Sequence, residues 1–433
     1  MTAGILLLGA AIFGSVAIIE IVTRRTDVGA ALVLGLVLVD ELTRSFDASA
    51  YLGSFRVGPA DLLFGVLFAS AIARLLRTEK LSTPQRLLAA IWILTVWSVG
   101  RGAATIAVTT AVNEARSFLL FLAAVLYFST AEPREGLYDT IGRLWLIAAS
   151  LLSVIALVRW GAAAAGSATG VLAPSGSDSL MRVLGSHETL YLGFAAVIAL
   201  PLMDAKNRLA LRLLTPVFLV FVLLLQHRSV WIATAVGLSF SLLSSGKTAR
   251  RAAPLLAGLV VLGVTLSALF APWENSLGTD LSTAAQTSGT WDWRVEGWVA
   301  LVDDAPSARS IEGAVGRPFG SGWTRALSAG RVVEVSPHNF YIAVLFRTGA
   351  VGLTLMIALY ALSARRTHVA ARDEQNNRGP LSPSLLRTIL VMQLVYFIPY
   401  GENIGIALLF GLACTSAADL PSRSRMALVS DKA

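Results

Sequence analysis

The sequence contains a single cysteine, Cys414, and few charged residues. One cysteine excludes an intrachain disulfide and any metal site built from several thiolates. Only 14% of the 433 residues are charged, and the 35 lysines and arginines are dispersed rather than clustered on a polar domain. We therefore expect no nucleic-acid partner. The chain also lacks an internal repeat of the kind that would support an inverted-repeat transporter.

Hydrophobic residues make up 55% of the chain and gather in long runs. Several runs reach the roughly 20 residues that an α-helix needs to cross a bilayer. A soluble protein would not sustain them, so we expect an all-α polytopic membrane protein in which residues 1–433 form one transmembrane domain. We predict about 12–13 crossings, at residues 3–22, 28–43, 60–76, 87–100, 115–130, 140–160, 187–203, 210–226, 229–245, 253–271, 338–362, 386–400 and 403–419.

The first run and the basic residues predict how the chain enters the membrane. Ala3 to Val22 has no basic residue before it, which favours a membrane helix over a cleaved signal. Most lysines and arginines lie in alternate predicted loops, and the positive-inside rule places those loops in the cytoplasm. The N-terminus is then outside and the C-terminus cytoplasmic. Arginine-rich composition with abundant alanine, leucine and glycine suggests a GC-rich bacterial gene, so we expect the bacterial inner (cytoplasmic) membrane.

Two long segments fall on the predicted outer side, 161–186 and 272–337. The first is rich in glycine, alanine and serine and predicts a flexible loop. The second is a large extracytoplasmic loop inserted before the helix that starts near 338. Helical spacing of its apolar residues predicts a short amphipathic helix. The residues on its apolar face are Trp291, Val295, Trp298 and Val302.

The large outer loop contains two further features that bear on function. Aromatic side chains with polar edges suit sugar binding as well as the bilayer interface, so Trp298 is a candidate residue of a substrate cavity. The glycines of 316–323 predict a tight, non-helical turn. A phosphate-cradling loop is a weaker interpretation of the same segment.

His338 follows the only long polar segment and precedes a new apolar run. Ser336 is a good N-cap and Pro337 suits the first helical position, which predicts His338 in the first turn of a helix. The positive end of the helix dipole disfavours a second positive charge. A neutral imidazole near a bound anion is a candidate general base. Taken alone, the spacing favours a simpler interpretation, a histidine at the membrane interface.

Two arginines on the predicted outer face are candidates for phosphate binding. Arg228 lies between two predicted membrane helices, and Arg294 lies on the predicted short helix. Arginine binds phosphate through two parallel hydrogen bonds. The pair would form a diphosphate clamp that requires no metal. The alternative for Arg228 is a side chain that extends to the lipid headgroups.

Arg347 is the third arginine of interest, because its position is deep in an apolar run. It lies nine residues beyond His338, about 13 Å along the helix axis, where a charge usually faces a cavity or a partner. We expect it to line the path of a lipid phosphate, with Glu20, Glu188 or Glu402 as alternative counter-ions.

The remaining candidates are polar residues near predicted helix ends. Glu188 begins an outer helix, and Asn339 and Tyr341 follow His338, so all three are candidate cavity residues. Asp40 and Glu41 are weaker alternatives as metal ligands or a base. Two adjacent acids more simply form a solvated acidic cluster.

These segments occur in a particular order between residues 210 and 362. The order is His227-Arg228-Ser229 with Trp231, then Arg294 and Trp298, then 318–322, then Pro337-His338-Asn339-Phe340-Tyr341, and last 348–353 with its Gly-x-x-Gly-Leu. It resembles the O-antigen ligase / O-antigen polymerase family, which are bacterial polytopic membrane glycosyltransferases. The segment 210–362 is the family-like catalytic region.

The resemblance implies a GT-C-type helical fold with its site on the extracytoplasmic face. It implies transfer of a glycan from a polyprenyl-diphosphate carrier to an acceptor hydroxyl on a glycan, lipid or cell-wall acceptor, with inversion and with no metal or other cofactor. Arg228 and Arg294 would bind the diphosphate, and His338 would activate or orient the acceptor hydroxyl. The first 200 residues match no motif of the family, which leaves the acceptor open.

Other functions fit parts of the sequence. Within the resemblance, the sequence does not separate a polymerase from a ligase. We slightly favour a polymerase-like cell-envelope enzyme, because the GC-rich composition suggests a bacterium without lipopolysaccharide. A transporter or flippase for a lipid-linked sugar would explain Arg347 and a helix broken at Pro399, but does not require a tryptophan-rich outer loop. A non-catalytic envelope scaffold leaves the charges within apolar runs unexplained.

Overall fold

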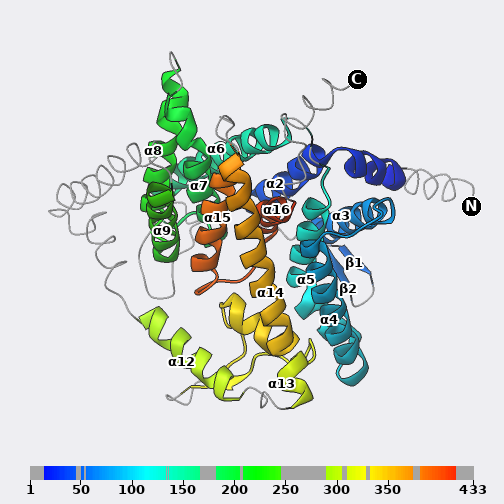
Figure 1. Cartoon of the computed structure of the whole chain (residues 1–433). Helices are drawn as coiled ribbons and strands as arrows, with labels where there is room; N and C mark the ends of the chain where they lie inside the picture. Colours follow the sequence, from blue (N-terminus) through cyan, green and yellow to red (C-terminus); the bar gives the residue numbers. More distant parts are fainter. Residues whose placement is uncertain are drawn as a thin grey trace, which may run out of the picture.

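The computed structural model covers the chain from Met1 to Ala433 and describes residues 14–44, 50–52, 55–132, 134, 136–165, 182–204, 208–244, 289–304, 310–327, 332–373 and 381–415. The described part is mostly α-helical (Figure 1). Its labelled helices are α2 (Thr26–Leu42), α3 (Pro59–Leu76), α4 (Thr83–Thr105), α5 (Val108–Ser129), α6 (Leu137–Ala164), α7 (Ser186–Ala199), α8 (Leu209–Leu224), α9 (Arg228–Ser244), α12 (Gly289–Asp303), α13 (Ile311–Val315), α14 (Phe340–Asp373), α15 (Pro383–Tyr396) and α16 (Ile404–Cys414).

Two small antiparallel hairpins accompany the helices. One pairs β1 (Ala50–Leu52) with β2 (Phe55–Val57), and the other pairs β3 (Arg325–Ala326) with β4 (Val332–Val333). The second hairpin lies in the predicted outer loop, between α13 and α14. The sequence interpretation as all-α did not include these strands, because their two or three residues are too short for a period-2 pattern to be recognised.

The helices support a multi-pass membrane architecture. Within the described residues, six are long and apolar enough to cross a bilayer: α3, α4, α5, α6, α7 with its 3-10 extension, and α14. Four shorter apolar helices accompany them: α8, α9, α15 and α16. Each coincides with a predicted crossing, as does α2. The predicted crossing at 253–271 and most of that at 3–22 lie outside the described residues.

Local sequence explains where several helices begin. The backbone N–H of Gly58 donates to Asp61 Oδ2 at 2.6 Å, with Pro59 as the first residue of α3. Ser82 N–H donates in the same way to Gln85 Oε1 at 2.9 Å before α4. The segment 103–113 holds the end of α4 and the start of α5.

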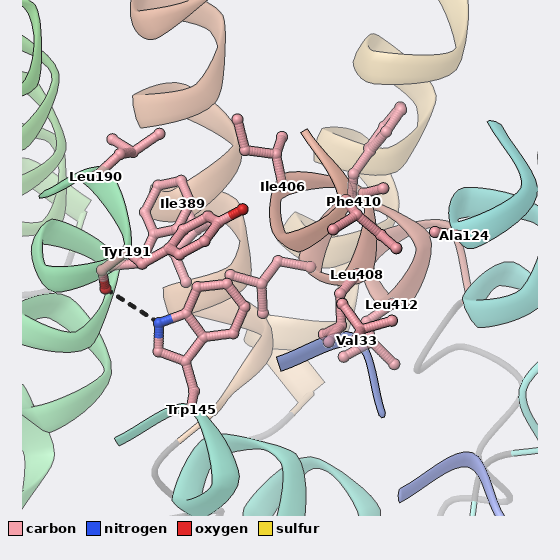
Figure 2. Close-up of a cluster of buried hydrophobic side chains, with 14 of the residues drawn as sticks. Val33, Ala124, Trp145, Leu190, Tyr191, Ile389, Ile406, Leu408, Phe410 and Leu412 are labelled. Carbon is pink, nitrogen blue, oxygen red and sulfur yellow. Dashed lines mark hydrogen bonds between the residues drawn. The ribbon is translucent and has the colours of Figure 1, made fainter. Parts of the chain in front are cut away.

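The core of the bundle surrounds α16, whose eleven residues are all buried. A helix that is apolar on every side is a helix enclosed by others, and α16 packs against α2, α5, α14 and α15. Figure 2 shows Ile406, Leu408, Phe410 and Leu412 of α16 among side chains from neighbouring helices. Nearby, the indole of Trp145 on α6 donates to the carbonyl of Tyr191 on α7 at 3.1 Å and links those helices.

The predicted outer loop lies at one end of this bundle. Figure 1 shows α12 and α13 near the first turns of α14, toward the bottom of that view. α14 is kinked at Gly349, whose φ is +67°. A Cβ at Gly349 would lie 2.2 Å from the carbonyl oxygen of Ala314, so glycine permits α13 to approach the kink.

Candidate functional site

His338 lies two residues before the first residue of α14 and is not part of that helix. The helix begins at Phe340, and Asn339 is its N-cap: Asn339 Oδ1 accepts from the N–H of Ile342 at 3.0 Å. The prediction of a helix starting at Ser336 was therefore wrong. Phe340 N–H bonds to the carbonyls of Phe397 and Tyr400 at 3.0 and 3.1 Å, which fixes the helix start against the end of α15.

The backbone of His338 is left-handed, with φ +49°. Among the described residues, the only other non-glycine residue with a positive φ is Gln226, at +57°. This conformation costs about 1–2 kcal/mol for a residue with a Cβ, and such strain is concentrated at functional sites. Gln226 precedes Arg228 by two residues, so both strained positions adjoin the candidate residues.

Four arginines surround His338 and the turn between α8 and α9: Arg294 and Arg325 act on His338, and Arg228 and Arg294 act on Arg182. No carboxylate of a described residue lies within 4 Å of any of them. We call this group the arginine cluster; it consists of Arg182, Arg228, Arg294 and Arg325. The charges of Arg228 and Arg294 act on Arg182, and unneutralised cations repel each other, so their proximity favours an anion at the site.

Arg182 and Arg228 are linked through the turn between α8 and α9. Arg182 Nη2 donates to the carbonyl of Gln226 at 3.2 Å. His227 Nε2 bonds to the carbonyl of Leu184 at 2.9 Å, which attaches the turn to the segment before α7. Burial lowers the pKa of His227 to about 4, so its ring is neutral near pH 7 and donates this hydrogen bond. The side chain of Arg228 makes no hydrogen bond within the described residues and is half-buried.

Arg294 projects from α12 to the segment that follows α15. Its Nη1 donates to the carbonyl of Pro399 at 3.3 Å, and its guanidinium lies 5.2 Å from the centre of the Tyr400 ring. Its Nε is buried and has no hydrogen-bond partner. Tyr400 stacks on Tyr396 at 4.9 Å and meets the ring of His187 edge-on at 6.1 Å. The aromatic residues therefore hold Arg294 next to the helix ends.

Arg325 and Trp298 hold the segment that precedes His338. Arg325 is buried and donates from Nη1 to the carbonyl of Val335 at 2.8 Å. The indole of Trp298 donates to the carbonyl of Pro337 at 2.6 Å. Trp298 is 9% exposed, so it is a support for the His338 backbone rather than an open platform for a sugar ring.

Electrostatics around His338 favour its neutral form. Burial lowers the pKa of His338, and electrostatic interactions with Arg294, Arg325 and His187 lower it further. Burial also lowers the pKa of Arg182; Tyr400 opposes this, whereas the charges of Arg228 and Arg294 add to it. Arg294 thus lies close enough to influence both His338 and Arg182, and the histidine and the arginine cluster form one site.

Arg347 is not part of this site. Its side chain is 2% exposed and forms an ion pair with Glu114 on α5. It also donates to the carbonyls of Pro318 and Gly322 and lies 4.0 Å from the centre of the Trp323 ring. The expected counter-ions Glu20, Glu188 and Glu402 were wrong, because Glu114 fills that place.

The same carboxylate occupies the glycine-rich turn. Glu114 Oε2 accepts from the backbone N–H of Gly320 at 2.9 Å and of Gly322 at 3.3 Å. Converging N–H groups form an anion site, and here the anion is a side chain of the chain itself. The phosphate-cradling interpretation of 316–323 is therefore not supported.

Other predicted residues have structural contacts. Tyr341 donates from its hydroxyl to the carbonyl of Leu394 at 2.7 Å, and Asn339 serves as the cap. Glu188 pairs with Arg44 at 3.4 Å. Of the predicted apolar face of α12, Trp298 is buried, but Trp291 and Val302 are 47% and 49% exposed.

The paired acids on α2 differ from one another. Glu41 is buried and paired with Arg44 and Arg159, whereas Asp40 is exposed. The two arginines give Glu41 a structural explanation. In the described part of the chain, no three His, Cys, Asp or Glu side chains are grouped so as to hold a metal ion.

Sequence reasoning missed Arg182, Arg325 and Tyr400. Arg182 was hidden at the end of a segment that resembles a flexible linker, and Arg325 lies between glycine-rich and polar stretches without periodicity. Tyr400 follows Pro399 at a predicted outer helix end, which was the one available signal. Comparison with models of known protein families gives no match for the sequence, and comparison with curated proteins gives none either.

Proposed function

We propose that the chain is a membrane glycosyltransferase that moves a glycan from a polyprenyl-diphosphate carrier to an acceptor hydroxyl on the extracytoplasmic face, as O-antigen polymerases and ligases do. The fold would then be of the GT-C type. The reaction would invert the anomeric carbon and require no metal. The product would contribute to a cell-surface polysaccharide.

The observation that carries the proposal is the arginine cluster beside His338. A glycosyl diphosphate brings about two negative charges, and guanidinium groups bind phosphate oxygens through paired, charge-assisted hydrogen bonds. Arg228 and Arg294 supply two such groups that no carboxylate of a described residue neutralises. Both are half-buried, which strengthens their attraction for an anion.

His338 supplies the acid–base group that transfer needs. A neutral imidazole accepts the proton of the acceptor hydroxyl as its oxygen bonds to the anomeric carbon. The lowered pKa of His338 keeps the imidazole neutral near pH 7. Its left-handed backbone and the hydrogen bond from Trp298 to the Pro337 carbonyl fix the position of the Cα that carries the imidazole. A single displacement by the acceptor inverts the anomeric configuration.

A transporter for the same lipid-linked sugar is the alternative. Arg347 was one of two features that this alternative explained, and its contacts with Glu114 and the glycine-rich turn now account for it. The break after α15 remains, but Pro399 and Tyr400 there contact Arg294 and the start of α14. These contacts favour a site built at one end of the bundle over a path through it.

The test is reconstitution of the purified chain in lipid nanodiscs with a polyprenyl-diphosphate-linked glycan and candidate acceptors. We expect a longer or transferred glycan with an inverted linkage, formed also in excess EDTA. If EDTA removes the activity and Mg²⁺ or Mn²⁺ restores it, the reaction requires a metal, and Asp40 and Glu41 become the candidate ligands. In proteoliposomes, movement of the donor across the bilayer without transfer would establish the transporter instead.

A further inference from the structure

Arg182 is held in place beside the turn that carries Arg228. Its Nη2 donates to the carbonyl of Gln226 at 3.2 Å. Two more side chains, one from α6 and one from the turn between α8 and α9, fix the segment 182–185, so the position of Arg182 does not depend on α7 alone. These contacts are His227 Nε2 to the carbonyl of Leu184 at 2.9 Å and Arg159 Nη1 to the carbonyl of Val183 at 2.7 Å.

The guanidinium of Arg182 retains unused capacity to bind an anion. Its Nε is buried and has no hydrogen-bond partner. No carboxylate of a described residue lies within 4 Å of it, and its charged neighbours include Arg228 and Arg294. A buried donor without a partner costs free energy, and a third cation beside two others costs more. An anion with charge to share among three guanidinium groups relieves both costs.

The charge of the diphosphate changes during the proposed reaction. In the donor, both phosphates are esterified and together carry about two negative charges; after the glycan leaves, the terminal phosphate is a monoester and the total rises to nearly three. The positive charges of two arginines balance the negative charge of the donor diphosphate, whereas three arginines are needed to balance that of the leaving group. A group that is matched only when the bond breaks lowers the barrier rather than tightening substrate binding.

We propose that Arg182 binds the departing diphosphate and stabilises the charge that forms on it; this inference rests on the proposed function. The acceptor oxygen bonds to the anomeric carbon as the bond from that carbon to the phosphate oxygen breaks. The electron pair of the broken bond stays with the diphosphate. The acceptor proton passes to His338, so one negative charge on the diphosphate and one positive charge on the imidazole form together.

A purely structural role for Arg182, as a support for the Gln226 turn, makes a different prediction. Loss of the support would displace Arg228 and weaken donor binding. Loss of a leaving-group ligand would instead lower kcat and leave the donor KM nearly unchanged. It would also weaken inhibition by pyrophosphate, because this ion resembles the leaving group.

The experiment compares Arg182→Gln, Arg182→Lys, Arg228→Gln and a control in the full-length protein in nanodiscs. The control is Arg101→Gln: Arg101 also has a buried, unpartnered Nε, but it stacks on Trp97 at 4.3 Å and donates to the carbonyl of Gly316. Transfer kinetics with the lipid-linked donor are measured together with the inhibition constant of inorganic pyrophosphate, per mole of folded protein.

We expect Arg182→Gln to lower kcat about 100-fold, to change the donor KM less than about threefold and to raise the inhibition constant of pyrophosphate at least about tenfold. Arg228→Gln raises the donor KM. Arg101→Gln resembles the wild-type protein in all three values. If Arg182→Gln does not fold, Arg182→Lys decides, because it keeps the charge and loses the paired hydrogen bonds, and we expect a kcat about tenfold lower.

Three results overturn the inference. If Arg182→Gln has the kcat of the wild-type protein, Arg182 does not stabilise the leaving diphosphate; where only Arg182→Lys folds, its kcat decides in the same way. The proposed function then stands, because the wild-type protein still transfers glycan. A raised donor KM with a kcat near the wild-type value shows that Arg182 acts through the turn. A wild-type protein that does not transfer glycan from the lipid-linked donor overturns the proposed function itself.

Discussion

At the scale of single residues, the strained backbone of His338 distinguishes this histidine from the others as a candidate functional residue. A left-handed φ of +49° disfavours most residues with a Cβ, and glycine or asparagine would relieve the strain. The strained backbone makes the imidazole a candidate functional group. A variant that keeps the left-handed backbone but lacks the imidazole separates the effect of the backbone conformation from that of the base.

We expect His338→Asn to fold normally and to lose transfer by about 100- to 10,000-fold, the range of general acid–base catalysis. Asparagine tolerates the left-handed region, so the melting temperature should remain near that of the wild-type protein. Glycan transfer and thermal unfolding of the purified protein are the measurements. His368→Asn is the control, because His368 lies far along α14, where it contacts Arg387. Full transfer by His338→Asn would remove the base from the mechanism.

The pH dependence of transfer tests the electrostatics of His338. Its pKa is lowered, and the protonated ring cannot accept a proton, so kcat/KM should fall only below the ordinary histidine value of 6.5. Removing the positive charge in Arg325→Gln lets the pKa of His338 rise. The acid limb of the pH profile should then move to higher pH, whereas Arg101→Gln should leave it in place. An acid limb that moves to lower pH in Arg325→Gln would contradict the assignment.

At the scale of elements, periodicity predicted helices well and helix boundaries less well. The predicted helix 291–302 corresponds to α12, Gly289–Asp303. The start of α14 was misplaced because Ser336 and Asn339 are both good caps by sequence. The choice between them depends on Phe340, whose N–H bonds to carbonyls of a segment more than fifty residues later in the chain.

The partner of Arg347 shows the same limit more sharply. Burial of a charge predicts that a partner exists, but the partner is Glu114, on a helix far earlier in the sequence. Only the packing of α4, α5 and α14 brings the two together. The arginine cluster is likewise assembled from four separate segments, of which the sequence identified two residues by motif.

Breaking the Glu114–Arg347 pair should affect stability rather than donor recognition. Glu114→Gln leaves Arg347 without its carboxylate, and removing one partner of a buried pair costs about 3–5 kcal/mol. Chemical unfolding in detergent measures this change, with the donor KM of the folded fraction unchanged. Arg24→Gln, which removes an exposed ion pair with Glu20, is the control and should cost less than about 1 kcal/mol. Unchanged stability with a raised donor KM would return Arg347 to the lipid path.

At the scale of the whole molecule, the site gathers segments that the charge pattern assigns to one side of the membrane. The segment before α7, the turn between α8 and α9, α12, the start of α14 and the segment after α15 all meet there. The basic residues that predicted the orientation lie mostly in other loops. The contacts therefore place these segments together at one end of the bundle, and the side of the membrane that this end faces stays a prediction from the charge pattern.

This orientation can be tested with the natural chain as a nearly cysteine-free background. Cys414 is 1% exposed, so it should not react with a membrane-impermeant maleimide. Ser336 is exposed beside the site, and Glu132 has a side chain that is 77% exposed in a loop expected in the cytoplasm. We expect Ser336→Cys to be labelled in intact cells and Glu132→Cys only after the membrane is permeabilised. The reverse pattern would place the arginine cluster in the cytoplasm, where an extracytoplasmic transferase cannot have its site.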